Sequence, residues 1–287
     1  MCELSVKRVL RAVGAIVAFY LAVLAVAFPM MLGVVVIWGE GTLSPGVSFG
    51  SLAIAALVVY TLLLKLGWAT ERMLGWPEAG RRGVRLVFRA FAFGAAVGCL
   101  MAAVALTLAF TAGSARVSFT GESLAGFVVS AGSLALLLLV AALAEELLFR
   151  GYPLARLSAV LGKVGASIAL AIVFALAHLF NPNVSTLGLV NIGLAALVLS
   201  AAFFTPGGLA AAWGLHWGWN AGLGLLADAP VSGLQFDLPA LDFSTGEPVW
   251  LTGGRFGPEG GLVATVAMVV VLVWLTRNDA QTTEDHS

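Results

Sequence analysis

The chain has 287 residues, of which 60% are hydrophobic and only 10% are charged, and its mean hydropathy is +1.01. Soluble domains carry about 25% charged residues, so this composition excludes an ordinary soluble protein. The formal net charge is zero, which removes the electrostatic reason to expect a nucleic-acid partner. The two cysteines, one at the extreme N-terminus and one in an apolar run, do not favour a disulfide framework.

Eight apolar stretches are long enough to cross a bilayer as helices, which takes about 20 mostly apolar residues. In chain order they cover residues 10–37, 48–68, 88–112, 127–150, 163–181, 184–204, 207–227 and 260–276. We therefore predict an all-α fold, a polytopic membrane bundle of eight transmembrane helices. No repeat, low-complexity tract or linker divides the chain, so residues 1–287 are expected to form a single transmembrane domain.

The Lys and Arg residues are distributed unevenly over the connections between these stretches. With a cytoplasmic N-terminus, thirteen of them fall on the inner side and only Arg116 and Arg255 on the outer side. Cytoplasmic connections are enriched in Lys and Arg, so both termini are predicted to be cytoplasmic, with the acidic segment 228–260 outside. The inner set is Lys7, Arg8, Arg11, Lys65, Arg72, Arg81, Arg82, Arg85, Arg89, Arg150, Arg156, Lys163 and Arg277.

Two adjacent carboxylates stand inside an apolar stretch. Glu145 and Glu146 interrupt LALLLLVAALAEELLFRG, whereas the other acidic residues fall in termini or connections. A carboxylate at mid-bilayer costs roughly 2.5–3.5 kcal/mol, and such residues usually mark a functional site. A helix end in contact with headgroup water is the alternative for this pair. His178 and His216 also lie in apolar stretches, while the third histidine, His286, belongs to a polar tail.

Helical spacing predicts which of these side chains meet. If the chain turns near residues 161–162, Glu145 and His178 stand at the same height on antiparallel neighbours, each about 16 residues from the turn. Glu146 and Arg150 are four residues apart and share a helix face. Arg150 can therefore neutralise Glu146 and leave Glu145 free for chemistry.

The seventh stretch has two contrasting faces. His216 and Asn220 are four residues apart, so they present an imidazole and an amide together. Gly214, Gly218 and Gly222 repeat the same spacing on the opposite face. Small residues in this pattern predict close packing against another helix, with the polar face turned towards a cavity.

Three motifs in this part of the chain resemble those of the CPBP family. EELLFRG (145–151), FALAH (174–178) and HWGWN (216–220) are similar to the patterns EExxxR, FxxxH and HxxxN/D, which that family carries in this order on separate membrane helices. The family comprises CAAX prenyl endopeptidases of the Ras-converting type and bacteriocin-processing or immunity proteins. The resemblance covers a catalytic core at residues 125–227, and Asn191 resembles the asparagine that precedes the last motif.

The resemblance implies an intramembrane endopeptidase that hydrolyses a peptide bond near the cytoplasmic side of the bilayer, as in the maturation of CAAX-box proteins. Glu145 would act as general base on a water molecule that His178 holds. His216 and Asn220 would stabilise the oxyanion. This division agrees with the needs of peptide hydrolysis, a base and donors aimed at the developing charge. The supporting residues would be Glu146 and Arg150.

A zinc site is the alternative to this metal-free mechanism. Glu145, His178 and His216 could supply one carboxylate and two imidazoles, with water as the fourth ligand. The resemblance favours a mechanism without a cofactor. The expected partners are a peptide or protein substrate, for which lipidation is left open, and the lipid bilayer.

Two other functions remain compatible with the sequence. A non-catalytic immunity or scaffold protein could use the same fold, although the motifs are intact. A proton-coupled transporter could use buried Glu and His as a relay, although the repeats typical of transporters are not found. In each case we expect a multi-pass integral protein of a bacterial-type plasma membrane.

Overall fold

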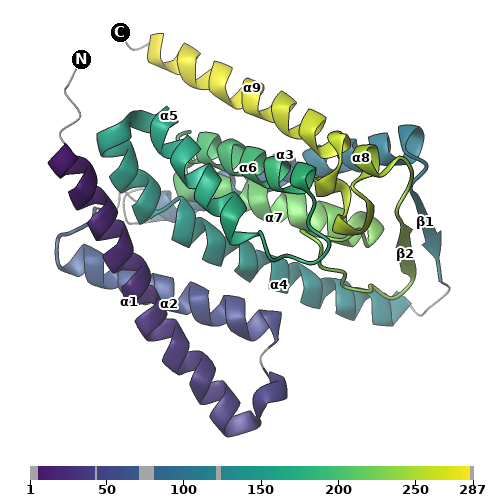
Figure 1. The fold of residues 1–287 in the computed structure, drawn as a ribbon, viewed down its shortest axis with the longest axis horizontal. Helices are drawn as coiled ribbons and strands as arrows, with labels where there is room; N and C mark the ends of the chain where they lie inside the picture. The colour runs from purple at the N-terminus through teal and green to yellow at the C-terminus, as the bar shows by residue number, and fades with distance from the viewer. Residues whose placement is uncertain (1–5, 43, 71–80, 121–123, 285–287) are drawn as a thin grey trace.

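A computed structural model describes residues 6–42, 44–70, 81–120 and 124–284. Eight long helices occupy the eight apolar stretches and confirm the predicted polytopic all-α bundle (Figure 1). They are α1 (Val6–Trp38), α2 (Pro45–Lys65), α3 (Arg81–Ala112), α4 (Leu124–Phe149), α5 (Tyr152–Ala177), α6 (Thr186–Phe203), α7 (Gly208–Ala227) and α9 (Leu262–Glu284). Cys2, Arg72 and His286 lie outside the described residues.

Length and composition mark five helical segments as able to cross a membrane within the described ranges. They are Val6–Trp38, Pro45–Lys65, Gly83–Ala112, Ala125–Ala177 and Thr186–Phe203. Large apolar side chains such as Phe88, Leu100 and Ile172 are exposed on the outside of the bundle. Because lipid is as apolar as these side chains, the outer surface of the bundle is suited to contact with lipid. The chain is an integral membrane protein.

Short elements join the helices at the end of the bundle away from the start of α1. They are η1 (Glu40–Thr42), β1 (Arg116–Phe119), β2 (Leu241–Ser244), α8 (Val249–Thr252), η2 (Gly254–Phe256) and η3 (Pro258–Gly260). The two strands pair antiparallel, with Arg116 opposite Ser244 and Phe119 opposite Leu241. This ribbon, which no pattern in the sequence predicted, joins the α3–α4 connection to the long segment between α7 and α9 (Figure 1).

Local sequence explains where several helices begin. Ser44 precedes α2, its hydroxyl accepts a hydrogen bond from the Val47 N–H at 3.3 Å, and Pro45 occupies the first helical position. Ser185 caps α6 in the same way by accepting from the Gly188 N–H at 3.0 Å. Such caps satisfy amide groups that the first turn leaves without partners.

The fourth predicted stretch does not continue past Arg150 as one helix. α4 ends at Phe149 and α5 begins at Tyr152. The Tyr60 hydroxyl stands in this break, donating to the Leu147 carbonyl oxygen at 2.7 Å and accepting from the Tyr152 N–H. A second break at Gly162 (φ 73°, ψ 168°) reverses the chain inside α5, which is where the sequence predicted the turn.

Glycines bring α3 and α7 into close contact. A Cβ atom at Gly214 would overlap the Phe91 carbonyl oxygen, and one at Gly218 would overlap that of Ala95. On α3, Gly98 meets the Leu215 carbonyl oxygen in the same way. The predicted small-residue face of the seventh stretch is therefore confirmed, and this contact fixes the rotation of α7 about its axis.

Gly218→Leu should destabilise the protein, because a side chain at this position must push α3 and α7 apart. Overpacking of a tight core costs about 1–3 kcal/mol, so the thermal unfolding temperature in detergent should fall. Gly132→Leu on α4 is the matched control, since a Cβ atom there meets no heavy atom within 4 Å. Equal unfolding temperatures for the two variants would contradict the assigned contact.

Candidate active site

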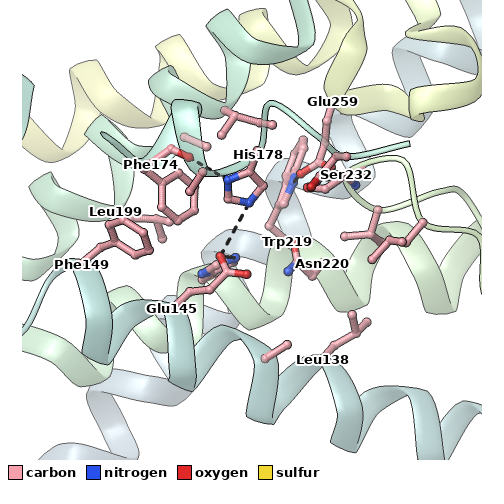
Figure 2. Close-up of a pocket in the computed structure, with 18 of the residues that line it drawn as sticks. Leu138, Glu145, Phe149, Phe174, His178, Leu199, Trp219, Asn220, Ser232 and Glu259 are labelled. Atoms are coloured by element: carbon pink, nitrogen blue, oxygen red, sulfur yellow. Dashed lines mark hydrogen bonds and ion pairs between the residues drawn. The ribbon is translucent and has the colours of Figure 1, made fainter. Parts of the chain in front are cut away.

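Three helices bring the predicted catalytic side chains to one place. Glu145 lies near the end of α4, His178 is the C-terminal cap of α5, and His216 lies in the middle of α7. Glu145 Oε2 is 4.0 Å from His178 Nε2 and 3.8 Å from His216 Nε2. Figure 2 shows Glu145 and His178 facing each other across the cavity. The equal heights expected for Glu145 and His178 are thus observed.

Glu146 points away from Glu145 and is fully buried. Its Oε1 atom is 3.0 Å from Arg150 Nη1 and 2.8 Å from His216 Nδ1. The Arg150 guanidinium also stacks over the Phe174 ring, 4.3 Å from its centroid. Arg150 is 1% exposed and Glu146 0%, so each charge needs the other in this apolar surrounding. The predicted pairing of Glu146 with Arg150 is confirmed.

A hydrogen bond at Nδ1 fixes the orientation of the His178 ring. Nδ1 is 2.7 Å from the Phe174 carbonyl oxygen. A carbonyl oxygen only accepts hydrogen bonds, so Nδ1 carries the proton. In the neutral ring Nε2 then presents its lone pair to the space beside Glu145, where it can accept a hydrogen bond from a water molecule.

His216 is oriented in a comparable way by Glu146. Its Nδ1 donates to the carboxylate, so Nε2 points to Glu145. Asn220, one turn further along α7, is 9% exposed and lines the same cavity. α7 thus presents an imidazole and an amide to the cavity, as the spacing predicted, beside the apolar side chains of Leu215 and Trp219.

These residues open into an apolar cavity of about 390 Å³. Its walls come from every long helix except α1 and from the segments that follow α5 and α7. Leu138, Phe149, Phe174 and Leu199 supply part of its apolar surface (Figure 2). Such a cavity can hold the side chains of an apolar peptide.

The sequence did not reveal that a further carboxylate, Glu259, is buried in the cavity wall. Glu259 was placed in an outer acidic segment, but it is 5% exposed and lines the cavity. Its Oε1 atom accepts from the Trp219 indole N–H at 2.8 Å, and Oε2 accepts from the Ser232 hydroxyl at 3.0 Å and from the Ser232 N–H. No apolar stretch surrounds Glu259 in the sequence, so composition gave no signal.

Asn191 is brought near the site without facing Glu145. Its amide Nδ2 donates to the carbonyl oxygens of Glu259 at 2.7 Å and Gly261 at 2.9 Å. Its Oδ1 accepts from the Thr265 hydroxyl at 2.7 Å. Asn191 therefore joins α6 to the start of α9 and holds the Glu259 turn against the cavity.

Arg150→Met should destabilise the protein by about 3–5 kcal/mol, because it leaves the buried Glu146 without its cation. The double variant Glu146→Leu, Arg150→Met removes both charges and should recover part of the loss. Unfolding in detergent measures both effects. Arg89→Met, at an exposed position on α3, is the control, and a loss no larger than this control's would contradict the pairing argument.

Residues 127–222 match the family model described as type II CAAX prenyl endopeptidase Rce1-like. The search of curated proteins gives no match. The matched residues include all three motifs, and the match supports an intramembrane protease with a peptide or protein substrate. The resemblance inferred from EELLFRG, FALAH and HWGWN is thus confirmed, and the motif-bearing part of this membrane bundle is similar to the Rce1-like CAAX endopeptidases.

Proposed function

We propose that this chain is an intramembrane endopeptidase in which Glu145 is the general base. The observation that carries the proposal is the position of its carboxylate, 4.0 and 3.8 Å from the Nε2 atoms of His178 and His216, inside an apolar cavity. Each separation is too long for a direct hydrogen bond. A water molecule fits between these groups and can be held by Glu145 and His178 together.

The proposed reaction begins with transfer of a proton from this water to Glu145. The hydroxide attacks the carbonyl carbon of the scissile peptide bond, and the carbonyl oxygen becomes an oxyanion. When the C–N bond breaks, the electron pair remains on the nitrogen, and the protonated Glu145 returns the proton to the leaving amine.

His216 and Asn220 are the proposed donors to the oxyanion. His216 donates to Glu146 through Nδ1, so donation from Nε2 requires a ring that carries both protons. The Glu146 carboxylate, 2.8 Å away, is the negative partner that such a ring needs. Asn220 adds an amide N–H from the same face of α7. The charged Glu146 is itself held by Arg150.

Zinc bound by Glu145, His178 and His216 is the competing proposal. In a tetrahedral zinc site with bonds of about 2.0–2.1 Å, ligand atoms stand roughly 3.3 Å apart, less than the separations of 3.8 and 4.0 Å measured from Glu145. Within the described ranges, no group of three His, Cys, Asp or Glu side chains has a geometry suited to a metal ion. The spacing is closer to that of a bridged water.

Glu145→Gln should reduce peptide cleavage by at least about 10²–10⁴-fold, because the amide cannot accept the proton from water. Cleavage of farnesylated and unmodified peptides ending in a C-A-A-X sequence measures the effect, with the purified full chain in detergent. Asp242→Asn, at an exposed acid on β2, should keep wild-type activity. Wild-type cleavage by a folded Glu145→Gln variant would exclude Glu145 as the base.

Incubation with a chelator should leave cleavage unchanged if Glu145 acts on a water that no metal holds. Metal analysis of the active, purified protein should then give less than one zinc per chain. Loss of activity with the chelator, restored by added zinc, would favour the metal mechanism with Glu145, His178 and His216 as ligands.

A further inference from the structure

The two ends of the bundle differ in charge. The start of α1 and the end of α9 lie at one end, and the β1–β2 ribbon lies at the other (Figure 1). Lys and Arg residues gather near the first end, and those with described side chains are Lys7, Arg8, Arg11, Lys65, Arg85, Arg89, Arg156, Lys163 and Arg277. Among the residues that the structure describes, only Arg116 and Arg255 belong to connections at the ribbon end. The charge rule for membrane proteins therefore places the ribbon end outside the cytoplasm.

The cavity lies at the outer end of α2. Pro45, Phe49 and Leu52, from the first two turns of this helix, line the cavity that holds Glu145. α2 has 21 residues and ends at Lys65, which corresponds to a rise of roughly 30 Å at 1.5 Å per residue. That length is about the thickness of the hydrocarbon core. The cavity is therefore separated from the cytoplasmic end by most of the length of α2.

The wall between Glu145 and the cytoplasmic end is closed by packed aromatic side chains. Tyr60 donates to the Leu147 carbonyl oxygen at 2.7 Å, and Tyr20 donates to that of Leu148 at 3.0 Å. The Phe19 ring packs against Tyr60 and Tyr152, with centroids 5.4 and 5.5 Å apart. The buried Arg150 and Glu146 belong to the same wall, which separates Glu145 from the cytoplasmic end.

The opposite side of the cavity is lined by segments without helical structure. Asn181 comes from the α5–α6 connection, and Ser232, Leu234 and Phe236 come from the segment after α7. The Asn181 amide donates to the Ser232 carbonyl oxygen at 2.9 Å, so the two segments meet. Both lie at the ribbon end. The cavity thus extends from Glu145 towards the outer end.

We propose that the substrate reaches Glu145 from the side of the membrane opposite the termini. The substrate would then be a polypeptide segment exposed outside the cytoplasm or embedded in the outer half of the bilayer, with apolar side chains next to the scissile bond. The nature of the substrate in this inference rests on the proposed peptidase function. The inference places substrate entry on the outer side of the membrane, whereas the resemblance implied cleavage near the cytoplasmic side.

Cysteine labelling tests the entry side without any need for activity. In a chain in which Cys2→Ser and Cys99→Ala remove the native thiols, Ala141→Cys places one thiol in the cavity wall, one turn before Glu145. Ser118→Cys on β1 and Arg85→Cys on α3 are exposed controls at the outer and cytoplasmic ends. A charged, membrane-impermeant maleimide is added to intact bacterial spheroplasts and, separately, after permeabilisation.

Ala141→Cys should behave like Ser118→Cys, so that permeabilisation leaves its labelling unchanged, whereas Arg85→Cys should react only after permeabilisation. Labelling of Ala141→Cys only after permeabilisation, or in neither case, would overturn the proposal. Ala177→Cys, in the opposite wall, gives the same readout should the first variant not fold.

A second experiment separates the entry side from the function. Sealed vesicles with a known orientation receive the C-A-A-X peptides on one side only, and Glu145→Gln supplies the blank. Cleavage of peptide added on the outer side supports the proposal, and cleavage only from the cytoplasmic side overturns it. If Ala141→Cys is labelled from outside but the protein does not cleave the peptides even in detergent, the peptidase function is contradicted and the entry side remains supported.

Discussion

The buried contact among Glu146, Arg150 and His216 is the constraint on which the site depends. A fully buried carboxylate is too costly in an apolar bundle without partners, and Glu146 finds them on its own helix and on α7, at 3.0 and 2.8 Å. The contact that neutralises the charge also fixes the His216 ring. Because Nδ1 is engaged, Nε2 must turn to Glu145. The hydrogen bond between His216 and Glu146 therefore both compensates the buried charge and orients the imidazole.

The glycine contact between α3 and α7 serves this arrangement. With no side chains at Gly214 and Gly218, the two backbones approach closely and leave α7 little freedom to rotate. A small rotation of α7 would carry His216 away from both Glu146 and Glu145. Packing of the glycine face against α3 therefore turns the opposite face of α7, with His216 and Asn220, towards the cavity.

Irregular backbone completes the cavity where the helices stop short. Membranes tolerate such backbone only when protein covers it or water reaches it, and the segment after α7 meets this condition through its polar contacts. Asp228 accepts from the Leu238 N–H at 3.0 Å, and Glu259 joins Trp219 to Ser232. These contacts hold the segment against the helices on the side where the cavity extends.

The sequence by itself determined the features that depend on local periodicity. Apolar length located the helices, and spacing within single helices identified the Glu146–Arg150 pair, the glycine face of α7 and the common face of His216 and Asn220. Only the tertiary structure decided that Tyr60 bonds across the helix break after Phe149, that Glu259 lies in the cavity wall, and which ring nitrogens face Glu145. These features depend on contacts between residues 40–92 positions apart along the chain. Such contacts follow from how whole helices pack, which no periodicity within one helix encodes.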